Sequence, residues 1–311
     1  MSESSSAEVL YSAIESASGL LDVPCSRDKV LPVLAAFGDE ISEESVVVLC
    51  MAGGERHRGD IDYNFTVPTA VGDPYRIAVE NGFAEDTDHP VGTLLSDIAE
   101  RCAVSFYGVE CGVVGGFKKT YIFFPLDQLG SLSAFADIPS MPPSLAEHAA
   151  TFARYGMADR VSIVGIDYSR KTMNIYFMAG SVEEKTALSL LSDVSLPEPK
   201  EPQLLEFIQN SFSIYPTLSW DSPQIERICF SSVSPDQNAY PATLEPEIAL
   251  FTKEAPYEYE GPRVLVYGSV ISRREEYQKL GVYYRRPASF WNSLPLAASF
   301  EQAVAAQRAQ Q

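Results

Sequence analysis

The chain has 311 residues, of which 46% are hydrophobic and 21% are charged, a composition typical of a globular protein with a sizeable core. Acidic residues outnumber Lys and Arg by 42 to 23, so the formal net charge is −19. Repulsion of polyanions argues against a nucleic-acid partner, and neither a secretion signal nor an apolar run of membrane-spanning length is present. We therefore expect a cytoplasmic protein that holds any anionic substrate with a local group of basic side chains.

Helix-like segments alternate with pairs of strand-like segments along the chain. Helices are predicted at residues 6–21, 26–37, 74–82, 91–101, 144–155, 183–193, 202–210, 245–253, 273–281 and 297–309. Strands are predicted at residues 44–52, 60–68, 103–111, 116–124, 160–168, 172–178, 211–219, 225–234 and 263–272. Paired strands favour an antiparallel sheet, so the predicted fold is α+β, with a helix–helix–strand–strand unit repeated about five times.

The strand faces suggest that this sheet closes on itself. A lysine stands between two aromatic residues on one predicted face, since Phe117, Lys119 and Tyr121 alternate with residues of the other face. Other strands also gather polar or aromatic residues on one face: Asp60, Asp62, Asn64 and Thr66; Asn174 and Tyr176; Ser213, Tyr215 and Thr217; Arg227, Cys229 and Ser231. If the apolar faces pack under the helices, about ten strands form a closed barrel with a solvent-filled lumen. The alternative is an open sheet whose polar face meets solvent.

No domain boundary is evident, so residues 1–311 are predicted to form a single domain, with the proline-rich stretch 196–202 as a loop. A closed barrel has no free edge, so we expect a monomer. Zinc-ligand spacing, a phosphate-binding loop, GxGxxG, GxSxG and an Asp-Asp-x-x-Asp cluster are all absent from the sequence.

Several cationic residues lie on the predicted inner faces or near them. Taken singly, each could be a solvated surface charge. As a group with Asn174, Tyr176 and Tyr215, they could bind a diphosphate through charge-assisted hydrogen bonds. The cationic residues of this group are Lys119, Arg170 or Lys171, Arg227, and Lys279 on the predicted helix 273–281. Asp62 could hold one Mg²⁺ ion, or it could cap a turn or pair with a lysine.

These residues lie in a sequence pattern that resembles the NphB-like aromatic prenyltransferases, the ABBA-type family that includes CloQ. The resemblance runs from Tyr11 to about Tyr284. It is carried by the stretches Gly19–Leu21, Arg27–Lys29, His89–Val91, Gly115–Tyr121, Ile138–Pro143, Phe152–Gly156, Ser211–Ser213, Tyr215–Leu218, Glu275–Tyr277 and Lys279–Gly281.

The resemblance implies a ten-stranded antiparallel barrel with a solvent-filled centre and outer helices. It also implies an enzyme of secondary metabolism. Such an enzyme transfers a prenyl group, commonly geranyl or dimethylallyl, from its diphosphate to an electron-rich aromatic carbon. The substrates expected are therefore a prenyl diphosphate and a small aromatic acceptor. The best acceptor on this basis is a hydroxynaphthalene or flaviolin-like polyketide, with a phenazine or a phenolic acid as the alternative.

The resemblance also implies roles for individual residues. The diphosphate-binding positions are Lys119, Arg170, Asn174, Tyr215, Arg227 and Lys279. Asp62 falls on the position associated with Mg²⁺, although members of the family that do not need Mg²⁺ exist. The aromatic pocket is expected to include Asn64, Tyr121, Ser162, Ile163, Ser213 and Tyr283. The catalytic set is Lys119 at the leaving diphosphate, Tyr121 and Tyr176 at the allylic cation, and Ser213 as a proton acceptor.

This sequence departs from NphB at four of these positions. Arg170 replaces a lysine, Ser162 a glutamine, Asn64 a serine and Ile163 a methionine. The last three changes fall in the aromatic pocket and leave the acceptor open. A barrel that carries an apolar ligand without catalysis is the alternative from another functional class.

Overall fold

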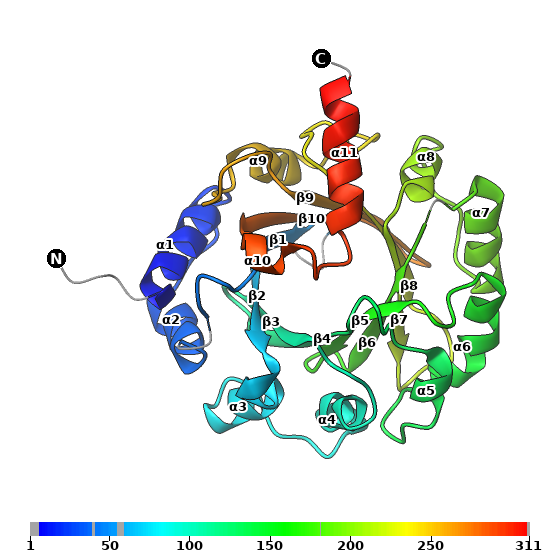
Figure 1. Cartoon of the computed structure of the whole chain (residues 1–311), viewed down its shortest axis with the longest axis horizontal. Coiled ribbons are helices and arrows are strands. Elements are labelled where there is room, and N and C mark those ends of the chain that lie inside the picture. Colours follow the sequence, from blue (N-terminus) through cyan, green and yellow to red (C-terminus); the bar gives the residue numbers. More distant parts are fainter. Residues whose placement is uncertain (1–5, 39–40, 55–58, 181, 310–311) are drawn as a thin grey trace.

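The computed structural model describes residues 6–38, 41–54, 59–180 and 182–309. Its centre is a closed, entirely antiparallel barrel with the strand order β1-β10-β9-β8-β7-β6-β5-β4-β3-β2. Figure 1 looks down this barrel and shows the helices arranged around it. The α+β class and the closed ten-stranded barrel are therefore confirmed.

Each strand pairs with its neighbour in sequence, and β1 closes the ring by pairing with β10. The strands are β1 (Val47–Ala52), β2 (Asp62–Pro68), β3 (Phe106–Gly112), β4 (Gly116–Phe123), β5 (Val161–Asp167), β6 (Thr172–Met178), β7 (Ser213–Ser219), β8 (Arg227–Ser234), β9 (Leu265–Ser272) and β10 (Glu276–Arg285).

The helices precede β1, connect successive hairpins or follow β10, and most of them surround the barrel (Figure 1). They are α1 (Ser6–Gly19), α2 (Arg27–Ala36), α3 (Pro74–Glu80), α4 (Leu94–Ala99), α5 (Leu132–Ala136), α6 (Pro143–Arg154), α7 (Glu184–Asp193), α8 (Leu204–Gln209), α9 (Pro246–Glu254), α10 (Ala288–Trp291) and α11 (Ala297–Ala309). Two short 3-10 helices span Thr69–Val71 and Pro90–Gly92.

The main hydrophobic core lies between the barrel and this ring of helices. On β2, Tyr63 and Phe65 point outward and are fully buried, and Phe65 meets Phe37, which follows α2, with ring centroids 5.5 Å apart. Asp62 and Asn64 on the same strand point into the lumen. The alternation of apolar and polar residues thus separates the core from the lumen, as the sequence predicts.

The end of the chain corrects one prediction. Residues 273–281 are predicted to form a helix, but Glu276–Arg285 form strand β10, hydrogen-bonded to β9 on one side and β1 on the other. The local sequence Glu-Tyr-Gln-Lys-Leu contains good helix formers. Pairing on both sides closes the barrel and outweighs that local preference.

A β-bulge in β4 corrects the predicted face of Phe117. Glu110 pairs with Lys119, but the next residue of β3, Cys111, pairs with Phe117, so Lys118 is an extra residue. The bulge reverses the alternation. Phe117 consequently packs in the outer core, while Lys119 and Tyr121 face the lumen.

The segment after β10 closes one end of the barrel. A second hydrophobic cluster joins Trp291, Leu294, Leu296 and Phe300 to barrel residues that include Val48 and Tyr283. In Figure 1, α10 lies inside the ring of outer helices. Within the described parts of the chain, no helix is both long and apolar enough to cross a bilayer.

Candidate active site

The barrel encloses a cavity of about 220 Å³ whose two ends differ in chemistry. On the β1–β10 pair, Ala52 lies beside Lys279 at one level and Val48 lies beside Tyr283 at another. Those levels are four positions apart on β1, which at about 3.4 Å per residue is roughly 14 Å. Charged side chains line the first end, and the second end is lined by Val46, Val48, Phe123, Phe212, Val266, Leu294, Pro295 and Leu296.

Two aspartates and a lysine form an ionic group at the charged end. The Lys118 ammonium lies 2.6 Å from Oδ2 of Asp60 and 2.5 Å from Oδ1 of Asp62. Burial raises the pKa of Asp62 to about 6, with a further contribution from the nearby Glu110 carboxylate and partial compensation by Lys118. Asp60 also accepts hydrogen bonds from the backbone N–H groups of Val114 and Gly115, which ties the group to the β3–β4 turn.

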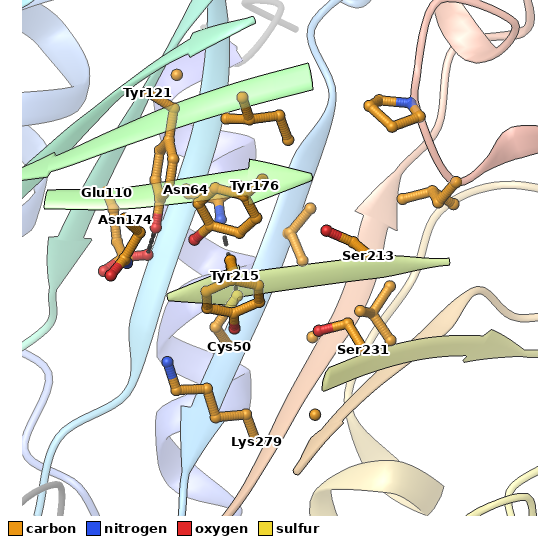
Figure 2. Close-up of a pocket in the computed structure, with 18 of the residues that line it drawn as sticks. Cys50, Asn64, Glu110, Tyr121, Asn174, Tyr176, Ser213, Tyr215, Ser231 and Lys279 are labelled. Atoms are coloured by element: carbon orange, nitrogen blue, oxygen red, sulfur yellow. Dashed lines mark hydrogen bonds between the residues drawn. The ribbon is translucent and has the colours of Figure 1, made fainter. Parts of the chain in front are cut away.

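Glu110 joins two residues of the predicted catalytic set. Its carboxylate accepts one hydrogen bond from the Lys119 ammonium and one from the Tyr121 hydroxyl, and Figure 2 shows Glu110 and Tyr121 in the lumen wall. Glu110 is only 5% exposed. Burial alone would raise its pKa, but Lys119 and the two hydrogen bonds outweigh burial and lower the pKa to about 2. The carboxylate is therefore ionised at neutral pH.

Three tyrosines form a continuous wall along the middle of the lumen. The rings of Tyr121 and Tyr176 meet edge to face at 6.2 Å, and those of Tyr176 and Tyr215 stack at 4.1 Å. The Lys279 ammonium lies 5.5 Å from the centre of the Tyr215 ring (Figure 2). Burial raises the pKa of all three phenols, so they are neutral at physiological pH. The wall thus presents neutral aromatic rings, whose faces are electron-rich, next to the cationic groups.

Glycines make room for this wall. Gly165 on β5 and Gly108 on β3 flank Tyr121 in the barrel register. A Cβ atom on Gly165 would lie 2.9 Å from Cε1 of Tyr121, closer than van der Waals contact permits, and one on Gly108 would lie 3.2 Å from its Cβ. The position of the Tyr121 ring therefore depends on the absence of a side chain at residue 165.

A pair of serines lies toward the apolar end. Ser213 on β7 and Ser231 on β8 are cross-strand partners, and both line the cavity (Figure 2). The Ser213 hydroxyl is buried and has no hydrogen-bond partner among the described residues. An unpaired buried hydroxyl is costly, so Ser213 is suited to bind a polar atom of a ligand.

Most of the predicted site residues meet in this cavity. Its lining includes Asp62, Asn64, Lys119, Tyr121, Ser162, Ile163, Asn174, Tyr176, Ser213, Tyr215, Lys279 and Tyr283. Arg170 and Arg227 lie outside the lining. Arg170 extends from the β5–β6 turn to within 3.6 Å of Asp167, and Arg227 at the start of β8 lies 3.4 Å from Glu226. Lys279 reaches the lumen from β10 instead of from the predicted helix.

Other residues of the site are absent from the sequence-based predictions. Glu110 carried a signal, because it is a single carboxylate in an otherwise uncharged strand, on the face shared with Gly108. Ser231 is predicted on a polar strand face together with Arg227 and Cys229, but without an assigned role. Lys118 depends on the bulge in β4, and Leu294–Leu296 depend on how the end of the chain folds back, so neither had a local signal.

Comparison with known proteins agrees with this architecture. The model of the family "Aromatic prenyltransferase Orf2" matches residues 5–291. The chain is 44% identical over 278 residues to a flaviolin linalyltransferase from Streptomyces virginiae, covering 89% of this chain and 91% of the relative.

Two further relatives are similar over most of their length. A furaquinocin biosynthesis prenyltransferase from Streptomyces sp. (strain KO-3988) is 44% identical over 93% of this chain and 94% of its own. A 5,10-dihydrophenazine-1-carboxylate 9-dimethylallyltransferase from Streptomyces anulatus is 41% identical over 92% and 95%, respectively. The chain therefore belongs to the aromatic prenyltransferase Orf2 family and is an aromatic prenyltransferase of secondary metabolism.

Proposed function

We propose that this enzyme transfers a geranyl or dimethylallyl group from its diphosphate to a ring carbon of a hydroxynaphthalene of the flaviolin type. The observation that carries the proposal is the arrangement of the lumen, with cations at one end, a tyrosine wall in the middle and apolar side chains at the other end. A prenyl diphosphate has the same order of anionic and apolar parts. Family membership decides against the alternative of a barrel that only carries a ligand.

In this proposal the diphosphate binds at the charged end. Lys119 and Lys279 line the cavity there, with the amide of Asn174 beside them. Lys279 has no carboxylate partner among the described residues and is available to an anion. Arg170 and Arg227 sit near the rim, where long guanidinium side chains can reach the outer phosphate. Together these charges stabilise the diphosphate as the allylic C–O bond breaks.

The allylic cation would form against the tyrosine wall. Each favourable contact of a cation with an aromatic face is worth roughly 0.5–2 kcal/mol. The acceptor ring attacks through carbon, a C–C bond forms, and the ring then loses one proton to restore its aromaticity. Ser213, directly or through an ordered water, is the candidate that receives this proton. The apolar end excludes water that would otherwise quench the cation.

The charged end also fits Mg²⁺ when a diphosphate is present. Among the described residues no group of three His, Cys, Asp or Glu side chains could hold a metal by itself. Mg²⁺ is commonly held by one or two carboxylates together with phosphate oxygens, and Asp62 offers such a carboxylate at the cavity surface. A bound Mg²⁺ would neutralise charge on the leaving diphosphate.

A phenazine acceptor is the second candidate, because one relative is named for prenylation of a dihydrophenazine carboxylate. A hydroxynaphthalene is preferred, because another relative is named for flaviolin and the hydroxyls of the cross-strand neighbours Ser213 and Ser231 suit phenolic oxygens. A phenazine carboxylate would instead bring a second negative charge into the lumen.

The proposal is tested by incubating the purified protein with geranyl or dimethylallyl diphosphate and each class of acceptor, with Mg²⁺ or with EDTA. We expect a hydroxynaphthalene product that is heavier by one prenyl unit, and less of it with EDTA. Asp62→Asn should remove the response to Mg²⁺, while the exposed Asp159→Asn should keep it. A product from phenazines alone would refute the hydroxynaphthalene acceptor in favour of a phenazine. Equal turnover with Mg²⁺ and with EDTA would contradict the Mg²⁺ assignment.

A further inference from the structure

We propose that Glu110 is a positioning residue, which orients the Tyr121 ring toward the reacting cation and restrains the Lys119 ammonium until the diphosphate binds. This inference rests on the proposed function of the lumen. Glu110 is not among the site residues predicted from the sequence. Its proposed role affects diphosphate binding and turnover in opposite directions.

The contacts of Glu110 carry the first step of the argument. Its two carboxylate oxygens have different partners, with Oε1 accepting from Lys119 and Oε2 accepting from Tyr121. Because Glu110 is buried in β3 and pairs with Lys119 across the sheet, the carboxylate is held by the barrel itself. A hydrogen bond to an ionised acceptor is also stronger than a neutral one.

The packing around Tyr121 explains why this contact determines an orientation. The ring lies against the bare backbone of Gly165 on one side and meets the edge of Tyr176 on another. Neither contact fixes the direction of the phenol oxygen, whereas the hydrogen bond to Glu110 does. With its hydroxyl held toward Glu110 at the charged end, Tyr121 presents its ring to the middle of the lumen (Figure 2).

The charges give the second step. Lys119 is paired with Glu110, and Lys118 is paired with Asp60 and Asp62. The negative charge of Glu110 therefore repels an incoming diphosphate, while its hydrogen bond keeps the Lys119 ammonium in place to bind that diphosphate. Removing its charge should strengthen diphosphate binding and weaken catalysis. A residue with a merely structural role would weaken both.

Glu110→Gln separates these effects. The amide keeps one acceptor oxygen, so when Lys119 donates to it, the Tyr121 hydroxyl loses its ionised acceptor and meets a neutral NH₂ group instead. We expect kcat to fall about tenfold or more, while the dissociation constant for inorganic diphosphate, measured by titration calorimetry, falls about threefold.

Glu258→Gln is the matched control, because Glu258 pairs with Arg285 outside the cavity lining. This variant should leave both kcat and the dissociation constant for inorganic diphosphate near their wild-type values. A kcat for Glu110→Gln within about twofold of wild type, or weaker diphosphate binding in step with lost turnover, would overturn the proposal.

Tyr121→Phe gives an independent test that leaves the Glu110–Lys119 pair intact. It should lower kcat about fivefold with little change in diphosphate affinity, and adding Glu110→Gln to it should lower kcat much less than in the wild-type background. An unchanged kcat in Tyr121→Phe would also overturn the proposal, even if Glu110→Gln failed to fold. Because diphosphate binding needs no acceptor, failure of every acceptor would refute the proposed function without deciding this inference.

Discussion

At the scale of single residues, the site works by pairing buried charges. Glu110 and Asp62 lie near each other in the lumen wall, yet their pKa values shift in opposite directions, to about 2 and about 6. Burial favours the neutral form of both. Lys119 and two hydrogen bonds overcome burial for Glu110, whereas Lys118 offsets it only in part for Asp62.

Lys119 should be essential for turnover, because its side chain lines the lumen together with Tyr121 and Tyr176. We expect Lys119→Ala to lower kcat/KM at least about a hundredfold while the protein stays folded by circular dichroism. The exposed Lys185→Ala on α7 is the matched control and should keep wild-type activity. Near-normal turnover by Lys119→Ala would refute the assignment of this lysine to the diphosphate.

The depressed pKa of Glu110 predicts a dependence of stability on pH. A carboxyl group whose pKa falls on folding, here from 4.5 to about 2, stabilises the fold above the unfolded value and loses that contribution as pH falls toward the folded value. The free energy of unfolding in urea should therefore decline less steeply between about pH 5 and about pH 3 in Glu110→Gln than in the wild type. Equal slopes would show that Glu110 is not held in its ionised form.

At the scale of elements, hairpin pairing and the alternation of strand faces could be predicted from sequence, and most predicted site residues meet in the lumen for that reason. The exceptions depend on interactions between elements. β10 is a strand because β1 and β9 need a partner, and Lys118 turns toward Asp62 because of a bulge. Neither feature has a local sequence signal, since the first depends on pairing with two neighbouring strands and the second on the register between β3 and β4.

The contact between β4 and β5 gives a prediction at this scale. Gly165→Ala places a methyl group against Tyr121, so the ring must move or the strands must separate. We expect kcat to fall about tenfold with a smaller change in donor KM. Gly180→Ala has open space around the new methyl group and should have no effect on kcat. If Gly165→Ala kept full activity, the ring position of Tyr121 would not matter for catalysis.

At the scale of the whole molecule, the closed barrel has a lumen with one apolar end and one charged end. The α10–α11 segment seals the apolar end with Leu294 and Leu296, and charged residues gather roughly 14 Å away. A donor can match this gradient in only one orientation, with its diphosphate near Lys119 and Lys279. In the proposed mechanism the acceptor would then lie toward Ser213 and Ser231, where its ring can reach the allylic carbon beside the tyrosine wall.

The most direct test of this account is a crystal structure with an analogue of geranyl diphosphate. In this analogue, sulfur replaces the oxygen that joins the allylic carbon to the diphosphate, which slows cleavage of that bond. The account predicts diphosphate density within hydrogen-bonding distance of Lys119 and Lys279, with the prenyl chain along Tyr121 and Tyr176. Diphosphate density at the opposite end, beside Ser213 and Leu294, would contradict the orientation of the donor and with it the proposed mechanism.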